Sequence, residues 1–120
     1  WAGLRSALAA AARAARPAPL SLEEFDGSLQ PSATVALFAR ARAVVGVHGG
    51  ALANMLFCGQ GTEVFEAGFR TPFAGHYRHL AAALGLRLML LPLAADERGI
   101  GGNEVRLADP DAALEAVGAR

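Results

Sequence analysis

Short apolar runs alternate with helical patterns along this chain of 120 residues, and that alternation limits its fold more than any other feature. Ala43–Val47 is rich in β-branched residues and is typical of a strand that is covered on both faces. Further along, Tyr77, Leu80 and Leu84 recur at helical spacing. Alternating strands and helices predict βαβ units with right-handed crossovers around a parallel sheet. We therefore expect a three-layer α/β fold.

The first expected element is an alanine-rich helix over Ala2–Ala15, which Pro17 stops. A poorly packed linker is the alternative for a sequence of this kind. We expect an N-terminal helical segment over residues 1–17 and a single domain over residues 18–120.

Turn and capping residues define the other expected elements. Asp26-Gly27-Ser28 is a turn signal, and Gly85 stands where a helix-ending glycine belongs. In chain order we expect a strand at Leu20–Phe25, a helix opened by Pro31 with Ser32 as its N-cap, a short helix at Ala51–Phe57, a strand at Glu63–Glu66, a helix marked by Phe73 to Leu84, a strand at Arg87–Leu91, a loop from Asp96 to Asn103 and a last helix from Pro110 to Gly118.

The composition excludes several broad classes of protein. With 53% apolar and 18% charged residues and a net charge of zero, the chain is neither a disordered protein nor one that coats nucleic acid through a high positive charge. Its longest apolar stretches, Leu8–Ala12 and Leu88–Ala95, are far shorter than the roughly 20 residues that span a bilayer. The lone Cys58 allows no internal disulfide and no cysteine-based metal site, so we expect a small buried hydrophobe. Because the chain begins at Trp1, we expect it to be a piece of a longer protein.

Two segments follow expected strands directly and are the places to look for a site. In an open parallel sheet, ligands bind outside the carboxyl ends of the strands. His48–Asn54 follows the strand at Ala43–Val47, and Glu66–Phe69 follows the strand at Glu63–Glu66. Because one crossover separates them, the two segments should face the same crevice.

The first of these segments carries small residues where a helix begins. Gly49, Gly50 and Ala51 would let a diphosphate approach free backbone N–H groups at the positive end of the helix dipole. His48 could donate a hydrogen bond to a phosphate oxygen, and Asn54 could hold either the loop or a ligand hydroxyl. The alternative is that the two glycines only permit a tight bend. The segment matches neither a Walker loop nor a G-x-G-x-x-G fingerprint.

Glu66 and the histidines are the other polar candidates. A carboxylate at Glu66 could accept hydrogen bonds from both ribose hydroxyls, and the alternative is an exposed glutamate at a strand end. His76 and His79 have a spacing that a metal site permits, with His48 as a third ligand, but surface histidines are the favoured interpretation and no metal is expected. Tyr77 belongs to the core face of its helix, and Arg78 could reach an anion.

Several segments together resemble the C-terminal region of glycosyltransferase family 61. They are Phe25 to Leu29, Leu37 to Ala41, the central run Val44-Val45-Gly46-Val47-His48-Gly49-Gly50-Ala51-Leu52-Ala53-Asn54-Met55-Leu56-Phe57, then Gly61 to Glu66, Tyr77 to Ala81 and Leu84 to Leu86. The family commonly has Gly-Ala-Gly-Leu-Thr-Asn after the histidine. This chain keeps the small side chains there but has Ala53 where the family has a hydroxyl.

The resemblance implies the C-terminal, donor-binding half of a GT-B glycosyltransferase, with a Rossmann-like parallel sheet. It implies an inverting transfer of a sugar from a nucleotide-sugar donor, UDP-linked by expectation, to a glycan or glycoprotein acceptor. His48, Gly49, Gly50 and Asn54 would then serve the donor loop, and Glu66 the ribose side.

The same resemblance sets expectations for cofactors, partners and compartment. No cofactor is expected beyond the donor substrate, and no Asp-x-Asp metal motif is present. Partners would be the donor, the acceptor and the N-terminal half of the same enzyme, which would carry the general base; no nucleic acid is expected, and a membrane only through an anchor elsewhere. The compartment would be the Golgi lumen in a eukaryote and the cytoplasm in a bacterium. The alternatives are a non-catalytic nucleotide-sugar-binding module and a structural α/β domain.

Overall fold

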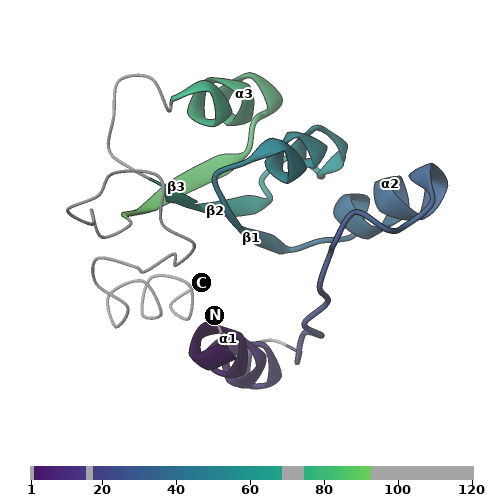
Figure 1. The fold of residues 1–120 in the computed structure, drawn as a ribbon, viewed down its shortest axis with the longest axis vertical. Coiled ribbons are helices and arrows are strands. Elements are labelled where there is room, and N and C mark those ends of the chain that lie inside the picture. Colours follow the sequence, from purple (N-terminus) through teal and green to yellow (C-terminus); the bar gives the residue numbers. More distant parts are fainter. Residues whose placement is uncertain (1, 16–17, 69–74, 93–120) are drawn as a thin grey trace. The chain divides into compact units, whose positions relative to one another are not determined.

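The computed structural model describes residues 2–15, 18–68 and 75–92 (Figure 1). The chain divides into two compact units, Phe25–Pro92 and a unit made of Trp1–Glu24 with Leu93–Arg120. The division into residues 1–17 and 18–120 stays a prediction. The expected loop from Asp96 and the expected last helix lie outside the described residues.

The N-terminal unit contains the expected alanine-rich helix, α1 (Ala2–Ala14), so the linker alternative is wrong for these residues. The chain after it folds back, because the amide of Leu20 donates to the carbonyl of Ala12 at 2.8 Å. Arg5 also forms an exposed ion pair with Glu24 at 2.7 Å, an interaction of small energetic weight.

The strand expected at Leu20–Phe25 is wrong. These residues form no strand in the structure, although the turn after them is confirmed: the Ser28 amide donates to Oδ1 of Asp26 at 2.8 Å, and Gly27 has φ of 87°. A strand needs a neighbour to satisfy its backbone groups, and within the described residues this segment has no neighbouring strand. The apolar pattern of these residues was therefore not sufficient to predict a strand.

A parallel sheet forms the centre of the unit Phe25–Pro92, as expected. It consists of β1 (Ala43–Val47), β2 (Glu63–Gly68) and β3 (Arg87–Pro92) in the order β1-β2-β3 (Figure 1). The register places Gly46 beside Glu66 and Glu66 beside Leu90. The structure thus confirms the α/β class and the parallel sheet within the described residues.

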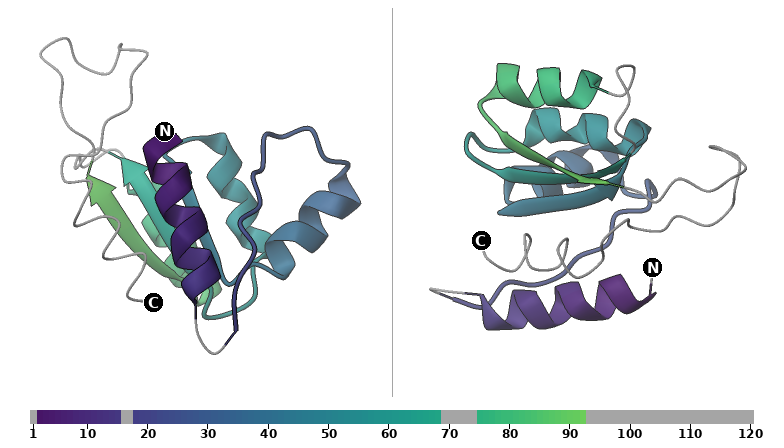
Figure 2. Two further views of the ribbon diagram at one scale, coloured as in Figure 1. Left: turned by 90° about the horizontal axis from the view of Figure 1, so that it is seen from below. Right: turned by 90° about the vertical axis from the view of Figure 1, so that its left-hand side faces the viewer.

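Two crossover helices connect the strands. Figure 2 shows η1 (Gly50–Phe57), which is a 3₁₀ helix, and α3 (His76–Leu84) on the same face of the sheet. This placement is what right-handed crossovers between successive neighbouring strands require. A third layer and membership of a GT-B enzyme stay predictions.

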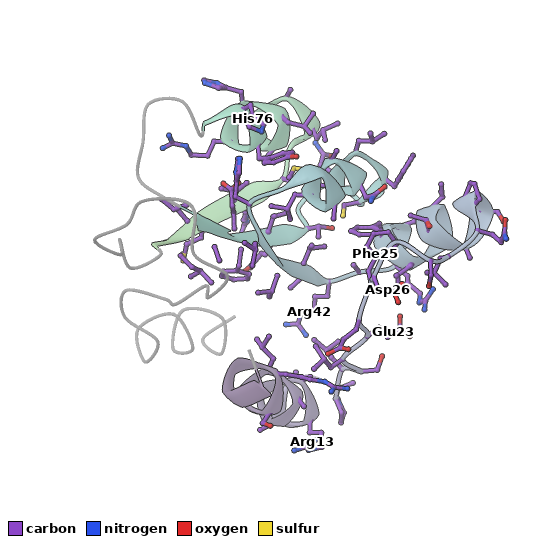
Figure 3. All side chains as sticks on the ribbon, in the orientation of Figure 1. Arg13, Glu23, Phe25, Asp26, Arg42 and His76 are labelled. Carbon is purple, nitrogen blue, oxygen red and sulfur yellow. The ribbon has the colours of Figure 1, made fainter. Side chains whose placement is uncertain are left out.

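The helix α2 (Pro31–Ala39) precedes β1 and packs beside η1. Its N-cap is Gln30, not Ser32 as expected. Pro31 takes the first helical position because its fixed φ suits it and its missing N–H costs nothing there, which moves Ser32 inside the helix. The ring of Phe25, which is labelled in Figure 3, precedes α2 in the chain. It packs edge to face against the ring of Phe38, with centroids 5.2 Å apart, and so links the preceding chain to α2.

The core lies between the sheet and the two crossover helices. Its buried members are Leu52, Met55, Val64, Tyr77, Ala81 and Leu86. Gly46 lets η1 approach closely, since a Cβ there would lie 2.9 Å from the end of the Leu52 side chain. Cys58 is half-buried against this core, and burial raises the pKa of its thiol. Gly85 ends α3 at φ of 70°, as expected.

No helix among the described residues is long and apolar enough to cross a membrane.

Candidate functional site

The carboxyl ends of β1 and β2 bring the two candidate segments together. The amide of His48 donates to the carbonyl of Ala67 at 2.8 Å, which continues the ladder one residue beyond β1. Gly68 then lies beside His48, and a Cβ added to Gly68 would be 3.5 Å from the Cβ of His48. The expectation that both strand exits face one place is confirmed for His48 and Glu66, which touch.

The central contact of the site joins His48 to Glu66. Nδ1 of His48 lies 2.6 Å from Oε2 of Glu66. The Glu66 side chain is 2% exposed, whereas that of His48 is 32% exposed. Burial of a carboxylate is costly unless it is hydrogen-bonded, and His48 supplies that bond. The alternative of an exposed strand-end glutamate is therefore wrong.

This contact determines which imidazole atom can meet a ligand. An ionised carboxylate can only accept hydrogen bonds, so Nδ1–H of His48 donates to Glu66. Nε2 then remains for another partner, and no described residue forms a hydrogen bond with it. The pair consists of a buried carboxylate and an imidazole that is partly open to solvent.

Two further rings pack around the imidazole. The ring of His76 lies 4.9 Å from that of His48, and the ring of Tyr77 lies 5.3 Å from it, both edge to face. His76 is exposed at the start of α3 (Figure 3), while Tyr77 is buried. The two rings, whose own centroids are 4.4 Å apart, restrict the orientations that His48 can adopt.

Tyr77 also holds the backbone of the loop. Its hydroxyl donates to the carbonyl of Gly49 at 2.7 Å, so the first turn of α3 is tied to the exit of β1. The sequence placed Tyr77 only on a core face, which is confirmed, and did not assign this bond. The first turn of a crossover helix lies at the carboxyl edge of a parallel sheet, and that rule could have pointed to His76 and Tyr77.

The two glycines after His48 have no structural reason to be glycine within the described residues. Gly49 is extended, at φ of 166°, and Gly50 lies outside the left-handed region. A Cβ on Gly50 would meet no described atom within 4 Å, and one on Gly49 would lie 3.8 Å from the nearest. The tight-bend explanation thus gains no support from backbone conformation or packing. The open space beside Gly50 is compatible with a ligand approaching the backbone.

The rest of the donor-loop residues belong to η1. The N-cap residue of η1 is Gly49, which has no side chain that could cap the helix, and Ala51 is exposed there. The side-chain amide of Asn54 donates to the carbonyl of Ala51 at 3.0 Å. Because both residues belong to η1, this bond lies within the helix, and the two roles considered for Asn54 stay predictions.

The histidines do not form a metal centre in the part of the chain that the structure describes. No group of three His, Cys, Asp or Glu side chains there could hold a metal ion. His79 is exposed on α3. The guanidinium of Arg78 folds back over the start of α3, where a Cβ on Gly75 would lie 3.3 Å from it.

Comparison with known proteins identifies one family. The family model described as Glycosyltransferase 61 matches residues 12–65. This stretch includes β1, His48 and η1, and it ends one residue before Glu66. No curated protein and no solved structure matches the chain. The match confirms the resemblance drawn from the sequence and supports assigning this chain to the family 61 glycosyltransferases.

Proposed function

We propose that the chain provides the donor diphosphate site of an inverting, nucleotide-sugar-dependent glycosyltransferase. The observation that carries the proposal is the pair His48–Glu66 beside two glycines that packing does not require. Family 61 membership supports glycosyl transfer, and the donor site is the part of that activity which the geometry fits best.

The proposed chemistry is stabilisation of a leaving group. An acceptor hydroxyl attacks the anomeric carbon, the bond from that carbon to the diphosphate oxygen breaks, and the diphosphate gains negative charge. Groups that are already in place when that charge develops stabilise the transition state. Nε2–H of the protonated His48 and the backbone N–H groups at the start of η1 would serve this purpose, with Arg78, whose guanidinium lies beside Gly75 at the start of α3, as a further cation.

The other components of the reaction are proposed on the family relation. The general base and the acceptor site would belong to the N-terminal half of a GT-B enzyme. The donor would be UDP-linked, the acceptor a glycan or a glycoprotein, and the compartment the Golgi lumen in a eukaryote or the cytoplasm in a bacterium.

Calorimetric titration of the chain with UDP and then with GDP tests the proposal. We expect binding to at least one of them, with His48→Ala weakening it by about tenfold or more, the loss that removal of a hydrogen bond to a charged group produces. His79→Ala is the matched control, because His79 is an exposed histidine of α3. A folded chain that binds neither nucleotide, alone or together with the N-terminal half, would contradict the proposal.

A further inference from the structure

Glu66 is the feature of the site that the donor-binding proposal leaves without a defined task. Ribose contact would require its carboxylate to be open to a ligand. In the structure the side chain is 2% exposed, and Oε2 is taken by His48 at 2.6 Å. Within the described residues, Glu66 belongs to the buried side of the site, with His48 between it and the solvent.

We propose that Glu66 is a positioning residue, which acts on the ligand only through His48. It accepts the hydrogen bond of Nδ1–H and so holds the imidazole with Nε2 facing the ligand; when Nε2 takes up a proton, the imidazolium donates from Nε2 to a phosphate oxygen while Glu66 balances its charge. The identity of the ligand rests on the proposed function, but the tautomer of His48 does not.

The packing around His48 shows why a partner at Nδ1 is needed. His76 and Tyr77 pack against the imidazole ring, yet a ring contact does not discriminate between the two imidazole nitrogens. Only a hydrogen bond selects the tautomer, and Glu66 forms the one that the described residues supply. Histidines that bind metals are oriented in the same way by a carboxylate at the second nitrogen, and loss of that carboxylate costs them 10- to 100-fold, roughly, in affinity.

The location of Glu66 suits this role. It is the fourth residue of β2 and pairs with Gly46 on one side and Leu90 on the other, so its backbone is fixed by the centre of the sheet. A residue on a rigid strand positions a neighbouring group more accurately than one on a loop. Gly46, the neighbour of Glu66 on β1, has no side chain, and the side chain of Leu52 from η1 occupies the space beside it.

The first test measures the tautomer directly and needs no ligand. Long-range ¹H–¹⁵N spectra of the imidazoles report which nitrogen carries the hydrogen. The chain has three histidines, and His76→Gln and His79→Gln assign their signals by elimination. We expect His48 as the Nδ1–H tautomer in the unmodified chain and a weaker preference for it in Glu66→Gln, whose neutral amide oxygen accepts a weaker hydrogen bond than a carboxylate does. An Nε2–H tautomer in the unmodified chain would overturn the proposal, whether or not any variant folds.

The second test separates positioning from ribose contact. UDP and inorganic pyrophosphate share the diphosphate, but only UDP has a ribose. If Glu66 acts through His48, Glu66→Gln weakens both ligands by a similar factor, on the order of tenfold. If Glu66 instead contacts the ribose, UDP alone loses affinity and the proposal is overturned.

Glu63→Gln is the matched control for this experiment. It removes the same charge from the same strand, but Glu63 is the first residue of β2, and the alternation of side chains along a strand directs it to the other face from Glu66. We expect no change in either affinity. If the unmodified chain binds neither ligand, the donor-site proposal fails, while the tautomer measurement still decides the role of Glu66.

Discussion

A buried polar residue lies near each end of β2, Thr62 just before the strand and Glu66 two residues before its last, and the two find their hydrogen-bond partners in different ways. Before the strand, Thr62 is 6% exposed, and the acceptors within reach of its hydroxyl are backbone carbonyls, that of Gly59 at 2.7 Å and that of Ala41 at 3.4 Å. Near the other end, Glu66 is 2% exposed and is paired with an imidazole from a different segment, 18 residues away.

The difference shows how a structural polar group can be distinguished from a functional one. The Thr62 hydroxyl contacts backbone carbonyls, so its hydrogen bonding serves the fold. The Glu66 bond ends on a side chain that is a third exposed and retains a free nitrogen within the described residues. A buried charge that supports a partly exposed group is typical of binding sites, because burial there fixes a group that must meet a ligand.

The largest expected effect comes from Tyr77, which joins the core to the site. Tyr77→Ala removes a buried ring and should lower the free energy of unfolding by about 3–4 kcal/mol. Tyr77→Phe keeps the ring and removes only the bond to Gly49, so it should cost about 1 kcal/mol. Urea denaturation measures both.

The affinity for pyrophosphate then shows whether the Tyr77 hydroxyl supports the ligand site, as proposed for Glu66, or only the fold, as proposed for Thr62. If Tyr77→Phe lowers the affinity, the hydroxyl supports the site, because the bond that holds the backbone at Gly49 is missing in this variant. If the affinity is unchanged, the hydroxyl bond of Tyr77 serves only the fold, like that of Thr62.

Thr62→Val tests the structural end. The substitution keeps the shape of the side chain and removes its hydroxyl bond, so we expect a loss of about 1 kcal/mol in stability. Ligand affinity should be unaffected, since the carboxyl edge of the sheet is unchanged. If UDP or pyrophosphate bound less tightly to a folded Thr62→Val chain, the contrast between the two ends would not hold.

A pair of glycine substitutions sharpens the same contrast. Gly85→Ala should cost about 1 kcal/mol, because Gly85 has φ of 70° and a Cβ there would lie 2.9 Å from the side chain of Gln60. Gly50→Ala meets neither obstacle, so thermal denaturation should show a stability equal to or slightly above that of the unmodified chain. Its methyl group should nevertheless reduce pyrophosphate affinity. A destabilised Gly50→Ala would restore the tight-bend explanation.

The smallest effect is expected at Asp26, an exposed counterpart of Thr62. Hydrogen bonds from the Ser28 side chain, and then from its amide, lower the pKa of Asp26 below its ordinary value of 3.8. With a pKa lowered by folding, the stabilising contribution is complete above pH 3.8 and disappears as pH falls through the lowered pKa. Carboxyl ¹³C titration should show the Asp26 pKa rising toward 3.8 in Ser28→Ala, and an unchanged value would contradict the assignment of the cause.

The sequence correctly predicted those features that depend on a residue and its near neighbours in the chain. Ala43–Val47 became a strand because its β-branched run suits a buried pleat, and Gly85 ends its helix because few other residues adopt its φ. The position of His48 at a strand exit followed from the general geometry of parallel sheets.

Features that depend on partners could not be predicted in this way. The burial of Glu66 depends on its register with Gly46 and on His48 reaching back to it, neither of which spacing reveals. Leu20–Phe25 reads as a strand until the missing neighbour is known. Ser32 failed as a cap because Pro31 competes for the same helix start.

The bond between Tyr77 and Gly49 has a consequence for how the chain folds. It spans 28 residues, and the bond between His48 and Glu66 spans 18, so both partners of each bond lie within the stretch from His48 to Tyr77. The entropy lost on closing a loop grows only slowly with its length, so these two closures differ little in cost. The site can therefore form only after β1, β2 and the first turn of α3 have come together.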